Sequence, residues 1–255
     1  MKLRSYSQWI RNRDWSSVAM EILIVVVGVI IALQVSNWNE GRKDAARGAD
    51  YLLRMQNELR ADVHRLGTMA AFWKSVNAEG RAALAHAEHG TLYQGSAWKT
   101  LRAYYQASQI WPYRKDDTTF QELRASGEFG LIRDPVLRAK GSRHYADTAG
   151  GATAEALGGA PAHPAHVRGM TPWAIQEYVW AHCYANAFES QQLVDCPSPV
   201  GDDEAMAVLR EYGESRELLG HLRFWVATNG LAITLSASLQ AEASKLADAI
   251  EQRNR

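Results

Sequence analysis

The sequence predicts an all-α protein in which one N-terminal transmembrane helix is followed by a helical bundle domain. Three observations favour this class. An apolar run lies near the N-terminus, apolar residues recur at helical spacing through most of the remaining chain, and no segment shows the sustained alternation of a strand. With 255 residues, the chain has room for one large domain or two small ones.

The net charge excludes one class of partner. The chain carries 28 basic and 28 acidic side chains, so its formal net charge is zero. Proteins that bind nucleic acid normally show a basic excess. We therefore expect no nucleic-acid partner.

The apolar run spans Val18–Val35 and is interrupted only by Glu21 and Gln34. Trp15 and Trp38 flank it, and a helix of ~1.5 Å per residue would place them roughly 35 Å apart. Tryptophan favours the two membrane–water interfaces, so this spacing fits an apolar slab with one Trp at each face. The sequence predicts a transmembrane anchor over residues 18–38, with the lipid bilayer as its partner.

The flanks of this segment predict how the chain is oriented. Basic residues before an apolar stretch also occur in cleaved signal peptides, but bulky polar residues follow here and no small-residue cleavage site is present. Residues 1–17 form a short tail with four Lys or Arg, against three just after the anchor. This slight bias favours a cytoplasmic N-terminus and a C-terminal domain in the periplasm.

Cys183 and Cys196 are the two cysteines of the chain. In a translocated domain, two cysteines at this spacing are typical of a disulfide. Two unrelated buried thiols are the main alternative, and metal binding by two lone thiols is a weaker one.

Small residues recur in the anchor at Gly28, Ala32 and Ser36. Their i, i+4, i+8 spacing places them on one face, where a second helix could approach closely. This stripe is a candidate helix–helix interface, and it predicts a protein partner or a homo-oligomer.

Residues 39–90 are predicted to form a juxtamembrane amphipathic helix. Seven apolar residues fall at a and d positions of a heptad, with Asp62 as a polar interruption: Leu52, Met55, Leu59, Leu66, Met69, Trp73 and Val76. A short coiled coil could use this pattern. The favoured interpretation is an ordinary amphipathic helix that packs on its own domain.

The first half of the helical domain is assigned to residues 91–148. Ser96 begins a helix that is expected to end at Trp111, and Thr119 with Glu122 forms a capping box for a short second helix. Gly127 supplies its C-terminal stop. Asp134 before a proline predicts a further helix start.

Residues 149–169 are rich in Gly, Ala, Pro and His, and they predict a flexible linker. Residues 170–255 form the second half of the domain. A helix begins at Thr171-Pro172, and two more are expected at about Asp203–Thr228 and Leu231–Gln252.

No motif in the chain carries catalytic chemistry. Neither a nucleophile elbow nor a phosphate loop is present, and the sequence predicts no catalytic, cofactor-binding or metal-binding residues. His86 and His89 are expected to be solvent-exposed on a polar helix, and His163 and His166 to be solvated in the linker. We therefore expect a protein that is not an enzyme.

Two segments resemble a known family. They are EILIVVVGVIIALQVSNWNE at Glu21–Glu40, and the ELxxSG element at Glu122–Gly127. Together they are similar to uncharacterised bacterial single-pass membrane proteins whose apolar helix ends in an NWNE-like tetrapeptide. The resemblance implies a bacterial inner-membrane protein with an N-terminal anchor, and it implies no activity.

The leading functional hypothesis is therefore a membrane-anchored, non-catalytic helical protein. It would act in protein–protein interaction, or as an accessory or scaffold subunit, at the periplasmic face of the inner membrane. The alternative is a periplasmic ligand-sensing module that signals through a lateral partner, since helical bundles can bind small molecules between helices. An enzyme with a site assembled only in space is a third possibility.

Overall fold

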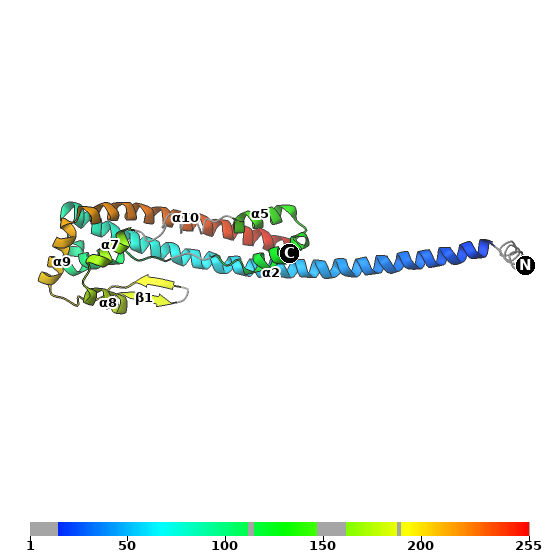
Figure 1. The fold of residues 1–255 in the computed structure, drawn as a ribbon, viewed down its shortest axis with the longest axis horizontal. Coiled ribbons are helices and arrows are strands. Elements are labelled where there is room, and N and C mark those ends of the chain that lie inside the picture. Colours follow the sequence, from blue (N-terminus) through cyan, green and yellow to red (C-terminus); the bar gives the residue numbers. More distant parts are fainter. Residues whose placement is uncertain (1–14, 112–114, 147–161, 188–189, 255) are drawn as a thin grey trace, which may run out of the picture.

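The computed structural model describes residues 15–111, 115–146, 162–187 and 190–254. In this part of the chain, α-helices predominate and the sheet content is one short two-stranded hairpin (Figure 1). The predicted all-α class is confirmed.

The longest element is α2, Trp15–His89, an unbroken helix of 75 residues. At ~1.5 Å per residue it is about 110 Å long. Its first part projects away from the rest of the molecule, and Gly48 is its first buried residue (Figure 1). The apolar part of α2 is long and hydrophobic enough to cross a membrane, which is compatible with a single-pass membrane protein.

The second long helix, α10 (Arg216–Asn254), lies antiparallel along the second half of α2 (Figure 1). Arg60 of α2 pairs with Asp248 near the end of α10, whereas Asn77 donates to the Val226 carbonyl near its beginning. The seven heptad residues of α2 are all buried. The predicted packing of this amphipathic helix on its own domain is confirmed.

The core is arranged as three clusters along this helix pair. The proximal cluster, nearest the projecting part of α2, includes Tyr51, Leu59, Phe120, Leu123, Leu246 and Ile250. The central cluster includes Leu66, Trp73, Trp111, Trp225 and Leu239. The distal cluster includes Leu101, Tyr104, Val167, Ile175, Val179, Tyr212 and Leu222. Each smaller helix covers one of these clusters.

The predicted boundary between the last two helices is wrong. The chain forms α9, Asp202–Glu214, and then α10, which continues through Gly230 without a break. Ser215 separates the two helices, and its Oγ accepts from the Leu218 backbone N–H at 3.1 Å. A mid-helix glycine costs only about 1 kcal/mol, and packing of α10 along α2 outweighs that cost.

The short helix η1, Tyr93–Gly95, leads into α3, Ala97–Gln106. As predicted, Ser96 caps α3, because its Oγ accepts from the Lys99 N–H at 3.3 Å. The helix ends at Gln106 rather than at the predicted Trp111. Trp111 instead packs in the central cluster.

The predicted capping box is wrong. Helix α4 spans Thr118–Ser126, and the Thr119 amide and hydroxyl both donate to the Glu58 carboxylate of α2. Glu122 pairs instead with Arg54. A carboxylate from a neighbouring helix has therefore replaced the local partner.

The predicted stop at Gly127 is confirmed, because this residue ends α4 with a left-handed φ of 72°. The short helix η2, Glu128–Leu131, follows, and then α5, Pro135–Ala146. The predicted cap at Asp134 is also confirmed. Its Oδ1 accepts from the backbone N–H groups of Val136 and Leu137, at 2.8 and 3.1 Å.

The linker prediction for residues 149–169 is wrong where it can be compared with the structure. Residues 149–161 lie outside the described residues, but α7 covers Ala162–Met170. His163, Pro164 and Val167 are buried there, so α7 is a packed part of the domain. A composition of small residues suggested flexibility, whereas three buried side chains at i, i+1 and i+4 fix this helix.

Helix α8, Trp173–His182, is followed by a hairpin that the sequence did not predict. Strands β1 (Tyr184–Ala187) and β2 (Ser190–Leu193) pair antiparallel, with Tyr184 opposite Leu193. Each strand has four residues, none of them fully buried, and this is too short for an alternation signal.

Candidate functional site

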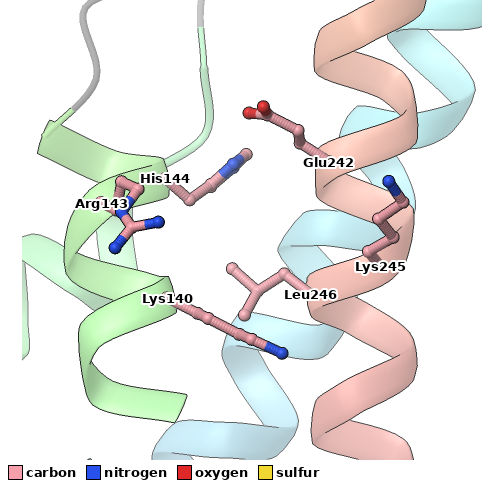
Figure 2. Close-up of a pocket in the computed structure, with 6 residues that line it drawn as sticks. All are labelled: Lys140, Arg143, His144, Glu242, Lys245 and Leu246. Carbon is pink, nitrogen blue, oxygen red and sulfur yellow. The ribbon is translucent and has the colours of Figure 1, made fainter. Parts of the chain in front are cut away.

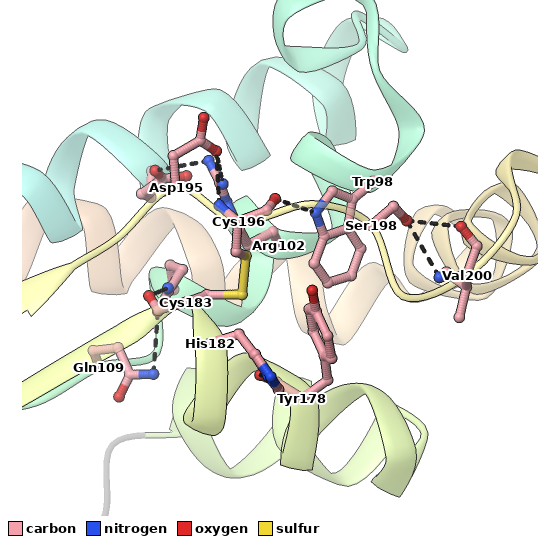
Figure 3. Close-up of a disulfide and its surroundings, with 12 residues drawn as sticks. Trp98, Arg102, Gln109, Tyr178, His182, Cys183, Asp195, Cys196, Ser198 and Val200 are labelled. Atoms are coloured by element: carbon pink, nitrogen blue, oxygen red, sulfur yellow. Dashed lines mark hydrogen bonds and ion pairs between the residues drawn. A yellow bond between two sulfur atoms is a disulfide. The ribbon is translucent and has the colours of Figure 1, made fainter.

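The structure contains the predicted disulfide between Cys183 and Cys196, whose Cα atoms are 5.2 Å apart. Cys183 ends α8 and Cys196 follows β2, so the bond closes the hairpin at its base (Figure 3). Both cysteines are buried in the distal cluster. Neither sulfur is a free thiol, so neither can act as a nucleophile in this state.

Helix α3 holds the base of this hairpin. The indole N–H of Trp98 donates to the Cys196 carbonyl at 3.1 Å, and the Gln106 side-chain amide donates to the Cys183 carbonyl at 2.6 Å. Arg102 of α3 donates to the Asp195 carboxylate, as Figure 3 shows. The disulfide thus closes the base of the hairpin, and three side-chain contacts attach that base to α3.

Arg102 also faces a second carboxylate. Glu79 of α2 lies 3.9 Å from its guanidinium, and both side chains are largely enclosed. Burial raises the pKa of Glu79, and the attraction of Arg102 only partly offsets that effect. Arg102 thus links α2 to the hairpin, because its guanidinium faces a carboxylate on each of them.

The predicted anchor residues lie on the projecting part of α2. Trp15 and Trp38 are exposed, and the Arg42 guanidinium stacks 5.1 Å from the centroid of the Trp38 ring. Gly28, Ala32 and Ser36 are also exposed, and a side chain at Gly28 would meet nothing within 4 Å. Their roles in the interface with lipid and with another helix stay predictions.

A positively charged cleft lies between α5 and α10 in the proximal part of the domain (Figure 2). It has a volume of about 330 Å³. Lys140 and Arg143 project from α5, and Lys245 from α10, against the single carboxylate of Glu242. Three cations and one anion around a small cleft could hold an anionic group.

A cluster of potential metal ligands lies between α7 and α10. The Nδ1 atoms of His166 and His221 are 3.2 Å apart. Glu217 stands one turn before His221 on α10, with a carboxylate oxygen 4.0 Å from its Nε2 atom. One ligand atom from each of these three residues falls within 4.8 Å of the others. Two imidazoles and a carboxylate could bind a transition metal.

His163 lies one turn before His166 on α7 and is only 1% exposed. Burial, together with a smaller effect of the nearby His221, His166 and Arg168, lowers the pKa of His163 to about 4. The Tyr104 carbonyl favours the protonated ring without reaching hydrogen-bonding geometry. This imidazole is therefore neutral at pH 7.

The predictions for the histidines have mixed outcomes. His89 is exposed as expected. His86 is only partly exposed, and its Nδ1 atom lies 3.1 Å from the Tyr104 hydroxyl. This partial burial lowers the pKa of His86. The prediction that His163 and His166 are solvated in a linker is wrong, since both belong to α7. His163 is buried and His166 meets α10.

The cluster of His166, Glu217 and His221 went unpredicted because His166 and His221 are 55 positions apart. One local signal was present: Glu217 and His221 have the i, i+4 spacing that places two side chains on the same helix face. The third member could be found only from the packing of α7 on α10.

Over the residues that the structure describes, the fold is all-α and one helix is suited to a single membrane crossing. Residues 21–78 are similar to a family of unknown function, DUF6090. The match includes Asn37–Glu40 and the beginning of the packed part of α2, but it stops before Glu122–Gly127. Comparisons with curated proteins and with solved structures give no match.

Proposed function

We propose that this chain is a membrane-anchored, non-catalytic protein that holds a helical domain at the periplasmic face of a bacterial inner membrane. It acts there by binding another protein, and a second copy of the chain is the first candidate. The continuity of α2 carries the proposal. One helix forms both the apolar anchor and the wall of all three core clusters.

This continuity couples the two ends of the protein mechanically. Within α2 no loop or kink separates Trp38 from Gly48, where packing against the domain begins. A rotation or shift of the anchor is therefore passed to the domain as a rigid-body motion. A second helix packed against Gly28, Ala32 and Ser36 would thus fix the orientation of two domains relative to each other.

Surface aromatics on the distal part of the domain also support a protein partner. Trp173 of α8 is 73% exposed and Phe224 of α10 is 72% exposed. Aromatic side chains are enriched at protein–protein contacts because they bury a large area with little loss of side-chain entropy. These two residues are the distal candidates for a contact with another protein.

Cysteine crosslinking in native membranes tests self-association. Both native cysteines are joined to each other, so an introduced cysteine is the sole free thiol. We expect Ala32→Cys to form a crosslinked dimer and Ile30→Cys not to, because residues two apart lie on nearly opposite helix faces at ~3.6 residues per turn. Equal crosslinking of both variants, or of neither, would contradict pairing through this face.

The periplasmic location of the helical domain is tested separately with a reporter enzyme fused after Arg255. We expect activity from a reporter that works only outside the cytoplasm. Activity from a cytoplasmic reporter at the same position would contradict the periplasmic assignment.

A second candidate function is ligand sensing in the same location. The charged cleft between α5 and α10 favours it, because Lys140, Arg143 and Lys245 surround a cavity of about 330 Å³. A ligand that binds only the folded state must raise the melting temperature. We would therefore screen inorganic phosphate and small dicarboxylates for an increase in the melting temperature of the wild type. The variants Lys140→Ala and Lys245→Ala should abolish that increase.

A further inference from the structure

We propose that His166, His221 and Glu217 bind one divalent transition-metal ion that joins α7 to α10. The three residues come from two helices far apart in the sequence, and they converge at a partly exposed position on the distal part of the domain. This inference is independent of the proposed protein-binding function.

The separation of the two imidazoles fits a shared ion. A tetrahedral zinc ion with bonds of about 2.0–2.1 Å to nitrogen has neighbouring ligand atoms roughly 3.3–3.4 Å apart. The Nδ1 atoms of His166 and His221 are 3.2 Å apart. The observed separation is therefore close to the one that a shared ion requires.

Glu217 completes the set of ligands. It is four residues before His221, and one of its carboxylate oxygens lies within 4.8 Å of one ring nitrogen of each histidine. Its side chain is 74% exposed, so a change of rotamer can bring the carboxylate toward the ion. A solvent molecule can occupy a fourth position because the site is open on one side.

The ligand types define which ions fit. Imidazole nitrogen with a single carboxylate suits Zn²⁺, Cu²⁺ or Ni²⁺ better than Mg²⁺ or Ca²⁺, which prefer oxygen ligands. The 3.2 Å separation is also that of a hydrogen bond between one protonated and one unprotonated ring nitrogen. Binding measurements distinguish these two interpretations.

A metal ion at this position would stabilise the distal part of the domain. Helix α7 follows residues 147–161, and it contacts α10 and covers the distal cluster. An ion held by His166 on one helix and by His221 and Glu217 on the other would crosslink them. Ion binding to the folded state then appears as a higher melting temperature.

The test uses the full chain in detergent, purified without a histidine tag and treated with EDTA. Zn²⁺ binding is measured by calorimetry, and Co²⁺ is used as a spectroscopic probe of the ligand geometry. We expect one Zn²⁺ per chain, the visible absorption of Co²⁺ with nitrogen and oxygen ligands, and a higher melting temperature with Zn²⁺.

Ligand variants locate the ion. Loss of a residue in the outer shell of a metal site typically weakens affinity about 10–100-fold, so His166→Ala and His221→Ala should each cost at least about 10-fold. The control His89→Ala changes an exposed histidine on α2 and should bind as the wild type does. Glu217→Gln should weaken binding without altering the fold, because the Glu217 side chain is exposed.

Two results would overturn the proposal. One is a wild-type protein that binds no Zn²⁺ beyond the level of the His166→Ala/His221→Ala double variant. The other is a wild-type site whose affinity is unchanged in Glu217→Gln and in both histidine variants, because the ion would then lie elsewhere. Should a histidine variant fail to fold, Glu217→Gln decides the outcome.

Discussion

The Glu58 carboxylate caps the start of α4 by accepting two hydrogen bonds from Thr119, 61 positions later in the sequence. The backbone N–H of Thr119 lies 3.0 Å from Oε1, and its hydroxyl lies 2.5 Å from the same oxygen. The side chain that satisfies this helix end thus comes from α2. The contact joins two elements of the proximal cluster.

Replacing Glu58 should therefore destabilise the domain. We expect Glu58→Ala to lower the free energy of unfolding by about 1–2 kcal/mol, because it leaves the Thr119 donors without an acceptor. Glu122→Ala should cost less, because Glu122 makes a solvent-exposed ion pair with Arg54 and such pairs contribute little to stability. Thermal unfolding of both variants gives the comparison. A larger loss for Glu122→Ala would favour the local capping box instead.

Gly48 is required where η2 comes closest to α2. A Cβ atom at this position would lie 2.6 Å from the Leu131 backbone oxygen. We expect Gly48→Ala to lower stability by about 1–3 kcal/mol through overpacking, despite the better helix propensity of alanine. Thermal unfolding in detergent measures the change.

The matched control is Gly41→Ala, seven residues earlier on the same helix. Apart from the adjacent residues and the helix's own backbone, no atom lies within 4 Å of a Cβ built there, so alanine should raise stability by up to about 1 kcal/mol. Opposite signs for the two variants are the expected outcome. Equal effects would mean that η2 does not pack on α2 at this distance.

The disulfide should stabilise the distal part of the domain. Its cysteines are 13 positions apart, and a loop of this size gives a stabilisation of about 2–4 kcal/mol through restriction of the unfolded chain. Reduction should lower the melting temperature of the wild type. The Cys183→Ser/Cys196→Ser variant should melt at the lower temperature whether or not a reductant is present.

Peptide mapping without reductant supplies the independent check on the bond. It should recover the peptides of Cys183 and Cys196 as one linked species. Two free thiols in protein taken from its native membrane would contradict both the bond and the periplasmic location that it supports.

His163 should make the metal-free protein sensitive to acid. Its pKa is about 4 in the folded protein, against 6.5 for an ordinary histidine, so between these values the unfolded chain binds more protons. The contribution of the neutral His163 ring to the free energy of unfolding is fully present above pH 6.5 and is lost as the pH falls toward 4. This loss amounts to about 3 kcal/mol, since each pKa unit corresponds to ~1.4 kcal/mol.

His163→Leu tests this dependence, because it keeps an apolar side chain and removes the titrating group. Chemical unfolding between pH 7 and pH 4 should show a smaller loss of stability in the variant than in the wild type. His89→Ala, at an exposed position, should follow the wild type. Parallel pH curves for the wild type and His163→Leu would contradict a buried neutral imidazole.

Local signals in the sequence predicted much of the fold. The apolar run with flanking Trp residues, the heptad stripe of α2, and the caps at Ser96 and Asp134 each depend on neighbours within one or two turns. Their physical cause is contained in the segment itself. The disulfide could be predicted for a similar reason, because the chain has two cysteines and they are close together in the sequence.

The sequence-based predictions that were wrong share a different cause. Glu58 caps α4 from 61 positions away, α10 continues through Gly230 because α2 supports it, and α7 is ordered by side chains that enter the distal cluster. In each case a tertiary contact overrode a correct local tendency. The meeting of His166 with His221 is of the same kind, since only the packing of α7 on α10 brings them together.

The central claim is that this chain works by binding another protein. The most direct test is the native mass of the complex, extracted from its own host in mild detergent after light crosslinking, with mass spectrometry of every band. The account predicts a discrete species larger than one chain, containing a second copy or one reproducible foreign subunit. A lone monomer under these conditions would contradict it.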